Sequence, residues 1–284
     1  MTPESIEKLL QPENPLPPVD LPDLPEILQQ AVKKAGWDEL KPVQRYTIPY
    51  VLAGRELMVQ SRTGSGKTGA FVLPMLSLLD PSQPVCQALV LVPTRELARQ
   101  VADQAELLGS VAGLRTVAVY GGVGYGAQLA AFRQGAHIVV GTPGRVLDHL
   151  LKESLTLEHL RLLVFDEADR MLSMGFYPDM RRVQEFLPRH EVNTSMFSAT
   201  FPAEVIRLAG RFMREPQLLS LSRDHVQVTD TDHYYYLVPG MEKDRCLVRI
   251  IEMENPRSAI IFCNTKDNVN YVATVLKRFG YNAN

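Results

Sequence analysis

The sequence has few cysteines and no long apolar run, and both absences narrow the class of protein. Only Cys86, Cys246 and Cys263 occur among the 284 residues. They are odd in number and far apart, which excludes a disulfide framework and a Cys-x-x-Cys metal pair. No apolar run approaches the roughly 18 residues of a membrane span, and the N-terminus lacks the pattern of a signal peptide. We therefore expect a cytoplasmic protein that does not contact membranes.

An excess of charge of one sign is also missing. The chain carries 30 lysines and arginines against 32 acidic residues, and its sequence pI is about 6.3. Without a global basic field, any binding of nucleic acid must come from a local surface. With 45% apolar and 22% charged residues, the composition is that of an ordinary globular protein.

The N-terminal segment is rich in proline, with seven prolines among the first 25 residues. We expect residues 1–23 to form an extended or disordered arm, in which only Ser5–Leu10 is compatible with a short helix. This arm is a candidate contact for a protein partner. The first helix is predicted over Leu24–Ala35, where apolar residues recur at helical spacing before Gly36.

The strongest local signal is the glycine-rich stretch Ser61–Thr68, between the apolar run Glu56–Gln60 and a helical run over Thr68–Leu79. A strand, loop and helix in this order offer backbone N–H groups to a phosphate at a helix N-terminus. Gly64 and Gly66 let the backbone approach the anion. The loop residues expected to bind the nucleotide are Arg62, Thr63, Gly64, Ser65, Gly66, Lys67 and Thr68.

Two side chains of this loop have specific expected roles. Lys67 is expected to reach the β- and γ-phosphates, and the Thr68 hydroxyl to bind Mg²⁺. The first position of the motif is Ser61 rather than glycine, a small residue that should preserve the loop. The alternative is an ordinary Gly/Ser-rich turn before a lysine, which the flanking strand and helix disfavour.

Further apolar runs predict strands at Gln87–Val92, Arg115–Tyr120, His137–Val140, Leu160–Phe165, Thr194–Ser198 and Gln217–Leu221. Their consecutive Val, Leu and Ile residues indicate a sheet that is covered on both faces. Strands that alternate with helical stretches predict an α/β fold, a P-loop domain with a mostly parallel sheet flanked by helices. In such folds ligands bind at the carboxyl ends of the strands.

One predicted strand ends in two adjacent acids, Asp166 and Glu167. Asp166 is expected to hold Mg²⁺. Glu167 is expected to position or deprotonate the attacking water, so that Lys67, Asp166 and Glu167 are the candidate catalytic residues. A helix N-cap rich in acids is the alternative, and it applies in part to Asp169.

Two weaker signals lie outside these motifs. The Gln44 amide can pair with two edge groups of adenine, although the residue taken alone favours a glutamine on a helix surface. Ser198 and Thr200 follow a predicted strand, where their hydroxyls could link the carboxylates to a neighbouring surface. An N-cap for the helix that starts near Pro202 is a nearly equal interpretation.

Together these segments resemble the DEAD-box ATP-dependent RNA helicases over about Val19–Leu221. Gly36–Gln44 resembles the adenine-reading Q motif, Ser61–Thr68 motif I, Pro93–Ala98 motif Ia, Gly121-Gly122 the paired glycines, Thr142–Arg145 motif Ib, Asp166–Asp169 motif II and Ser198–Thr200 motif III. Two departures concern the Q motif, where Val19 replaces an upstream aromatic residue and Leu40 replaces a proline. They put adenine stacking in doubt but not pairing through Gln44.

The resemblance implies a RecA-like domain that binds ATP with Mg²⁺, locally unwinds duplex RNA and hydrolyses ATP to ADP and phosphate. Asp169, Ser198 and Thr200 would couple the two activities. RNA would be held through its backbone, with little sequence preference. The residues implied for this contact are Pro93, Thr94, Arg95, Gly122, Thr142, Pro143, Gly144 and Arg145. Tight turns at strand ends are a compatible interpretation of the glycines.

The resemblance also implies two domains, with an N-terminal RecA-like helicase ATP-binding domain over 24–222, a linker over 223–240 and the start of a second RecA-like domain over 241–284. In the last part we expect a helix over Met241–Glu252, a strand over Arg257–Cys263 and a helix ending near Gly280. Tyr234–Tyr236 is expected to form an alternating strand over apolar surface.

Later motifs of the second domain, including an arginine-bearing segment, do not occur before Asn284, so we expect this chain alone to be a poor ATPase. Two alternatives stay open. One is a truncated nucleotide- and RNA-binding module without unwinding activity, and the other is a DNA helicase or translocase. Competition between RNA and DNA of equal length would test the DNA helicase or translocase, because contacts to the 2′-hydroxyl distinguish RNA from DNA.

Overall fold

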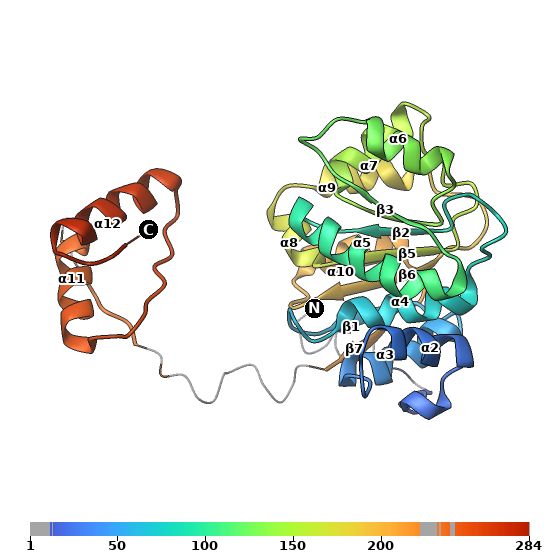
Figure 1. The fold of residues 1–284 in the computed structure, drawn as a ribbon, viewed down its shortest axis with the longest axis horizontal. Coiled ribbons are helices and arrows are strands. Elements are labelled where there is room, and N and C mark those ends of the chain that lie inside the picture. The colour runs from blue at the N-terminus through green and yellow to red at the C-terminus, as the bar shows by residue number, and fades with distance from the viewer. Residues whose placement is uncertain (1–11, 13, 222–231, 233, 239–241, 284) are drawn as a thin grey trace. The chain divides into compact units, whose positions relative to one another are not determined.

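A computed structural model describes residues 12, 14–221, 232, 234–238 and 242–283 (Figure 1). The helix-compatible segment Ser5–Leu10 lies outside these residues. The chain divides into two compact units, Met1–Val226 and Gln227–Asn284, which are described separately below.

The first unit is built on a seven-stranded sheet in which all neighbouring strands are parallel. The strands are β1 (Leu57–Gln60), β2 (Ala88–Leu91), β3 (Thr116–Val119), β4 (Ile138–Gly141), β5 (Leu162–Asp166), β6 (Asn193–Ser198) and β7 (Gln217–Ser220). Their order across the sheet is β3-β4-β2-β5-β6-β1-β7. The predicted parallel α/β fold is confirmed, and each strand predicted for this unit is present.

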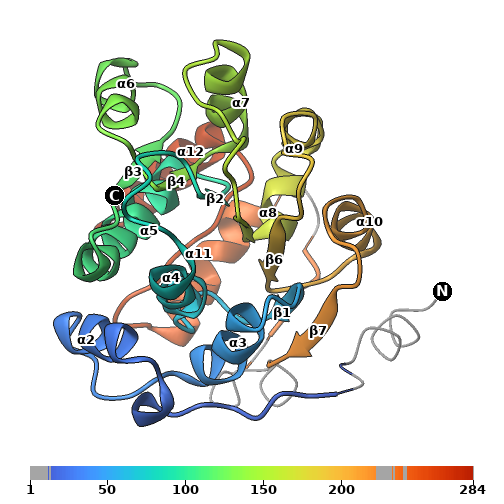
Figure 2. The same ribbon diagram turned by 90° about the vertical axis from the view of Figure 1, so that its right-hand side faces the viewer.

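Helices cover both faces of the sheet (Figure 2). They are the 3₁₀ turns η1 (Leu21–Asp23) and η2 (Ser110–Ala112) and the α-helices α2 (Glu26–Lys34), α3 (Pro42–Leu52), α4 (Lys67–Leu78), α5 (Arg95–Gly109), α6 (Gly126–Arg133), α7 (Pro143–Leu151), α8 (Ala168–Ser173), α9 (Tyr177–Gln184) and α10 (Ala203–Phe212). Helices α2–α5 pack in the core on one face, and α7–α10 pack in the core on the other. Leu57 and Val59 of β1 face the first core while Met58 faces the second, which explains why successive strand residues are apolar.

Helix α4 is buried on all sides. Every residue from Gly69 to Leu76 is buried, and the helix lies against α2, α3 and α5. A helix that is apolar all round needs such surroundings, because it has no face to expose to water. Its first residue is Lys67, and it is preceded by Gly66 in the left-handed region at φ 97°. The core therefore fixes the C-terminal end of the glycine-rich loop.

Part of the proline-rich N-terminal segment is tied to α3. The Leu16 amide donates to the Tyr50 hydroxyl at 2.9 Å, and the Val19 amide donates to the Arg45 carbonyl at 3.1 Å. Asp20 forms an ion pair with the Arg45 guanidinium at 2.9 Å. Residues 15–20, which precede η1, form neither a helix nor a strand.

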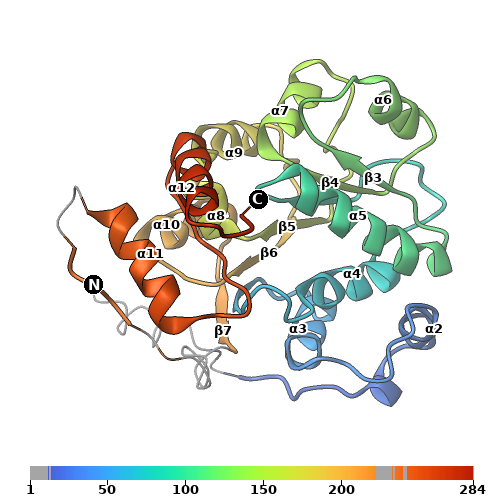
Figure 3. The same cartoon turned by 60° about the vertical axis from the view of Figure 1, so that its left-hand side comes forward.

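The second unit contains α11 (Lys243–Glu254) and α12 (Lys266–Arg278), both predicted from the sequence (Figure 3). The Tyr271 hydroxyl of α12 donates to Asp244 Oδ2 of α11 at 2.9 Å. Val248 and Leu276 are the large apolar side chains buried among the described residues of this unit. The apolar contact between the helices is therefore small.

The predictions of two strands in this part of the chain are wrong. Arg257–Cys263 is irregular, and Ile260 and Phe262 are 83% and 92% exposed. Tyr234–Tyr236 is also irregular, with Tyr235 87% exposed. A strand needs a neighbour for its N–H and C=O groups, and no described residue pairs with either segment.

Among the residues that the structure describes, no helix is both long and apolar enough to cross a membrane.

Candidate functional site

The predicted site residues gather at one edge of the sheet, at the carboxyl ends of the strands. Strands β1, β6 and β5 are consecutive neighbours and carry the glycine-rich loop, the Ser198–Thr200 segment and the acidic pair. Strands β2, β4 and β3 are also consecutive and carry the segments that begin at Pro93, Thr142 and Gly121. Because β5 adjoins β2, the two halves meet in the middle of the sheet.

Lys67 and Asp166 form the buried centre of the first half. Lys67 Nζ lies 3.4 Å from Asp166 Oδ1, and the two side chains are 6% and 4% exposed. The Ser61 amide donates to the Ser198 carbonyl at 3.0 Å, which places the start of the loop beside β6. Serine at this motif position is therefore compatible with the loop, as its burial at 2% exposure also indicates.

The Asp166 carboxylate is buried and lies beside one cation. Burial raises its pKa, and the neighbouring Lys67 cation acts in the opposite direction. Apart from the 3.4 Å ion pair with Lys67 Nζ, its buried Oδ1 atom has no hydrogen-bond partner. Such an oxygen fits a hard cation like Mg²⁺, with Thr68 as a second oxygen donor. Among the described residues, no group of three or more His, Cys, Asp or Glu side chains is arranged to hold a metal ion.

Glu167 has an unusual backbone for a glutamate. It lies in the left-handed region at φ 55° and ψ 50°, at the N-cap of α8. Its side chain is largely buried, and Arg170 NH1 lies 3.0 Å from its Oε2. Both residues line a pocket of about 490 Å³ together with Lys67 and Thr200. Arg170 was not predicted from the sequence, although an acid and an arginine three residues apart at the start of a helix often pair.

Asp169, Ser198 and Thr200 are joined by hydrogen bonds. Thr200 Oγ1 donates to Asp169 Oδ2 at 2.7 Å, and the Thr200 amide donates to the same oxygen at 3.1 Å. The Asp169 amide donates to Ser198 Oγ at 3.2 Å. Burial opposes ionisation of Asp169, but the hydrogen bonds with Thr200 and Ser198 outweigh it and lower the pKa. The N-cap of α10 is Pro202 and accepts no side-chain hydrogen bond, so the capping interpretation of Ser198 and Thr200 is wrong.

Gln44 is buried and bridges α3 to the glycine-rich loop, so the interpretation as a surface glutamine is wrong. The Lys41 amide donates to Gln44 Oε1 at 2.8 Å, and Gln44 Nε2 donates to the Gly66 carbonyl at 3.1 Å. A Cβ on Gly69 would lie 2.5 Å from Gln44 Nε2 and 2.9 Å from the Trp37 ring. The packing of Trp37 was not predicted from the sequence, since contacts between α4 and the loop that joins α2 to α3 leave no local pattern.

The second half joins segments that follow three strands. Arg95 extends from the start of α5 to Gly122, where a Cβ would overlap its guanidinium. Gly122 also has a φ of 79°, a backbone conformation that is unfavourable for residues other than glycine. Thr94 is the N-cap of α5, and its hydroxyl accepts from the Leu97 amide at 3.2 Å. Thus the hydroxyl of Thr94 is already engaged in the fold, while the Arg95 side chain stays exposed.

Helix α7 begins with Pro143 after Thr142, and most of this first turn is buried. Arg145 is only 9% exposed. Its Nε donates to the Tyr120 carbonyl at 3.0 Å, and its NH2 donates to the Val123 carbonyl. The guanidinium therefore faces the loop that carries Gly122.

Comparisons with known proteins agree with this arrangement. The family model described as DEAD/DEAH box helicase matches residues 41–208. ATP-dependent RNA helicase DeaD of Haemophilus influenzae is 43% identical over 259 residues, which are 91% of this chain and 42% of that protein. DEAD-box ATP-dependent RNA helicase CshA of Bacillus licheniformis is 38% identical over 90% of this chain and 52% of its own length. The chain thus spans about half or less of these relatives.

The fold is also similar to a solved structure. The crystal structure of a DEAD box protein from the hyperthermophile Methanococcus jannaschii aligns with a TM-score of 0.67 and 31% identity. The alignment covers 91% of this chain and 69% of that one. With its phosphate loop, acidic segment and linked hydroxyls on one sheet edge, the chain belongs to the DEAD/DEAH box helicase family.

Proposed function

We propose that this chain is the ATP- and RNA-binding part of an ATP-dependent RNA helicase, which locally unwinds duplex RNA and hydrolyses ATP to ADP and phosphate. The observation that carries this proposal is the shared sheet edge. Candidate nucleotide residues follow β1, β5 and β6, and candidate RNA residues follow β2, β3 and β4. Two relatives at 43% and 38% identity are named as ATP-dependent RNA helicases.

On the nucleotide side, the loop Arg62–Thr68 would wrap the phosphates with its backbone N–H groups. Lys67 would bind the β- and γ-phosphates from its buried position beside Asp166. Gln44 would pair with adenine through the remaining amide hydrogen and oxygen lone pair, since each of its two polar atoms makes one hydrogen bond in the fold.

Glu167 would accept the proton of the water that attacks the γ-phosphate. Asp166 and Thr68 are the residues that fit Mg²⁺, which when bound would neutralise phosphate charge and polarise the phosphoryl group. The contacts of Asp169 with Ser198 and Thr200 would transmit the state of the acidic segment to β6 and the chain that follows it.

On the RNA side, the chain would contact phosphate and ribose rather than base edges, with little sequence preference. The residues proposed for this contact are Pro93, Thr94, Arg95, Gly122, Thr142, Pro143, Gly144 and Arg145. We further propose that residues 24–222 form the ATP-binding domain, that 223–240 is a linker and that 241–284 begins a second RecA-like domain. The protein would act in the cytoplasm, and the arm 1–23 is a candidate contact for a protein partner.

The test is the ATP hydrolysis rate of this chain with and without single-stranded RNA, together with a nucleotide-binding titration. We expect ATP to bind, and Lys67→Ala to weaken binding by at least about tenfold, because a charge-assisted phosphate contact is lost. RNA-stimulated turnover would establish the helicase chemistry in this chain. Binding without turnover would favour the truncated-module alternative. Equal competition by RNA and DNA of the same length would favour a DNA translocase, and absence of ATP binding would refute the proposal.

A further inference from the structure

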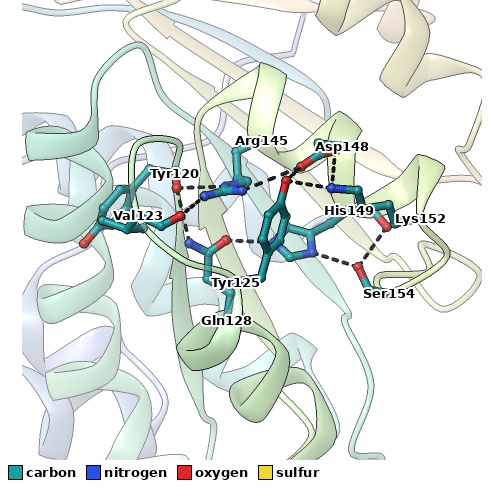
Figure 4. A network of polar contacts seen from close by, with 9 residues as sticks. All are labelled: Tyr120, Val123, Tyr125, Gln128, Arg145, Asp148, His149, Lys152 and Ser154. Carbon is teal, nitrogen blue, oxygen red and sulfur yellow. Dashed lines mark hydrogen bonds and ion pairs between the residues drawn. The ribbon is translucent and has the colours of Figure 1, made fainter.

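Tyr125 lies at the centre of a polar network between the loop after β3 and helix α7 (Figure 4). Its hydroxyl donates to Asp148 Oδ2 at 2.5 Å and accepts from Lys152 Nζ at 2.6 Å. Lys152 also pairs with Asp148 Oδ1 at 3.0 Å. One phenol group therefore joins the loop to two charged side chains near the C-terminal end of α7.

The aromatic ring of Tyr125 makes a second set of contacts. The Arg145 Cζ atom lies 4.1 Å from the ring centroid, and Lys152 Nζ lies 4.0 Å from it. Both distances are within the range of a cation–π contact. Since Arg145 also donates to the Tyr120 and Val123 carbonyls, the ring and these carbonyls hold the guanidinium together.

A further layer extends the network to α6. Gln128 Nε2 donates to the Tyr120 carbonyl at 3.2 Å, and Gln128 Oε1 lies 2.8 Å from His149 Nε2. Because Oε1 can only accept, His149 carries its proton on Nε2. The other ring nitrogen lies 2.7 Å from Ser154 Oγ. The end of β3, helix α6 and helix α7 are thus connected by hydrogen bonds.

The segment that this network holds has little else to fix it. Residues 121–124 read Gly-Gly-Val-Gly, and 122–124 are exposed. Three glycines in four positions give the backbone many accessible conformations when it is free. Arg95 and Arg145 contact this segment from the N-terminal ends of α5 and α7, and Tyr125 anchors its C-terminal end.

We propose that Tyr125 is a positioning residue for RNA binding, which locks the segment 121–124 onto α7 so that Gly122 and the start of α7 form one preformed surface for the RNA backbone. The inference rests on the proposed function. A preformed surface avoids the entropy cost of ordering a glycine-rich loop when RNA binds. Tyr125 acts through the loop and needs no contact with RNA itself.

The variant Tyr125→Phe removes the hydroxyl and keeps the ring. We expect its affinity for a fluorescein-labelled 10-mer of single-stranded uridines to be about threefold to tenfold weaker, as for the loss of one or two hydrogen bonds. ATP affinity should not change. If one phosphate contact is lost, the slope of log affinity against log salt should fall by about 0.7. The matched control is Tyr46→Phe, because Tyr46 is exposed and its hydroxyl makes no hydrogen bond with a described residue.

Hydrogen exchange of the RNA-free chain tests the locking by itself. Tyr125→Phe should speed exchange at 121–125 and leave the loop 61–68 unchanged. A double variant of Tyr125→Phe with Asp148→Ala should bind RNA no more weakly than the worse single variant, since each single change removes the hydrogen bond between Tyr125 and Asp148.

Unchanged RNA affinity in Tyr125→Phe would overturn the proposal. Equal losses of ATP and RNA affinity with a lowered melting temperature would also overturn it, because they would indicate general destabilisation. If the unchanged chain failed to bind RNA, the proposed function would be wrong, and the exchange comparison would still decide whether Tyr125 fixes the loop.

Discussion

Glu167 has a backbone conformation that is unfavourable for a glutamate, and its side chain has a defined position. For a residue other than glycine, the left-handed region costs of order 1–3 kcal/mol and persists only where the surroundings impose it. Here the residue stands between the end of β5 and the start of α8, both of which are buried. The strained turn places the carboxylate in the pocket that Lys67 and Thr200 also line.

Replacement of Glu167 by glutamine tests the role of its charge at nearly constant volume. We expect Glu167→Gln to bind ATP like the unchanged chain and to lose about 10²–10⁴-fold in turnover, because the amide cannot accept the proton of the attacking water. A nucleotide-binding titration and a phosphate-release assay with RNA measure the two quantities. Normal turnover in this variant would show that another group is the base.

Arg170 supplies a control for this experiment. Arg170→Gln removes the partner of Glu167 at 3.0 Å and leaves the carboxylate in place. Because its side chain is 56% exposed, the ion pair is expected to contribute less than about 1 kcal/mol to stability. A loss of turnover as large as that of Glu167→Gln would mean that the cation, rather than the carboxylate, is the more important group.

At the scale of elements, two glycines in helices differ in the space around them: one is closely packed and the other is open. A Cβ on Gly69 of α4 would meet Gln44 and Trp37 at less than 3.0 Å, whereas a Cβ on Gly210 of α10 would meet nothing within 4 Å. The first position lets the segment that contains Trp37 and Gln44 pack directly on α4. The second is an exposed position in a helix interior.

We therefore expect opposite effects of the same substitution. Gly69→Ala should lower the free energy of unfolding by about 1–3 kcal/mol through overpacking, and it should weaken discrimination of ATP from GTP. Gly210→Ala should raise the free energy of unfolding by about 0.4–1 kcal/mol through helix propensity and a less flexible unfolded chain. Urea unfolding and nucleotide competition measure both. Equal stability of the two variants would contradict the packing described for α4.

Most strands of the first unit were predictable because both faces of the sheet are covered, so that strands such as Ala88–Leu91 are continuous apolar runs. The predicted strand over Arg257–Cys263 is equally apolar and yet irregular. Its residues carry the propensity but lack a neighbour, and pairing is a tertiary property. Sequence therefore gave the candidates for strands and could not show which of them have partners.

In the candidate site, features that depend on adjacent residues were predictable, and contacts between residues distant in sequence were not. The glycine-rich loop before a helix and the acidic pair at the end of a strand were predictable as local structure, because each depends on residues adjacent in sequence. The packing of Trp37 on Gly69 and the contacts of Tyr125 with Asp148 connect residues that are distant in sequence, and no local pattern marks them. The geometry of Arg145 likewise depends on the carbonyls of a loop 22 residues away.

At the scale of the whole molecule, buried histidines predict loss of stability in mild acid. Burial lowers the pKa of His137 and of His149, and the nearby Arg115 and Arg145 cations lower them further. From about pH 6.5, the ordinary histidine value, down to the lowered pKa, the unfolded chain binds more protons than the folded one. The free energy of unfolding should therefore fall as the pH falls below about 6.5. Asp166, with its raised pKa, acts in the opposite direction.

Urea midpoints between pH 7.5 and pH 5 measure this dependence. His149→Gln should reduce the slope of stability against pH, because one titrating group is removed. His159→Gln is the matched control, since His159 is exposed and its replacement should leave the slope unchanged. A slope that is identical in all three proteins would show that the acid response comes from other groups.

The order of the strands has a consequence for synthesis of the chain. Among the described strands, β1, which leads into the glycine-rich loop, pairs with β6 and β7 alone, so that Leu57 cannot be paired before Ser195 and Gln217 are made. At about 5–20 residues per second, a ribosome needs on the order of 10 to 30 s to make the intervening segment. During that time the glycine-rich loop is present in the nascent chain, but the strands that pair with β1 are not. The loop after β1 therefore takes its folded shape late in synthesis, after β6 and β7 have left the ribosome.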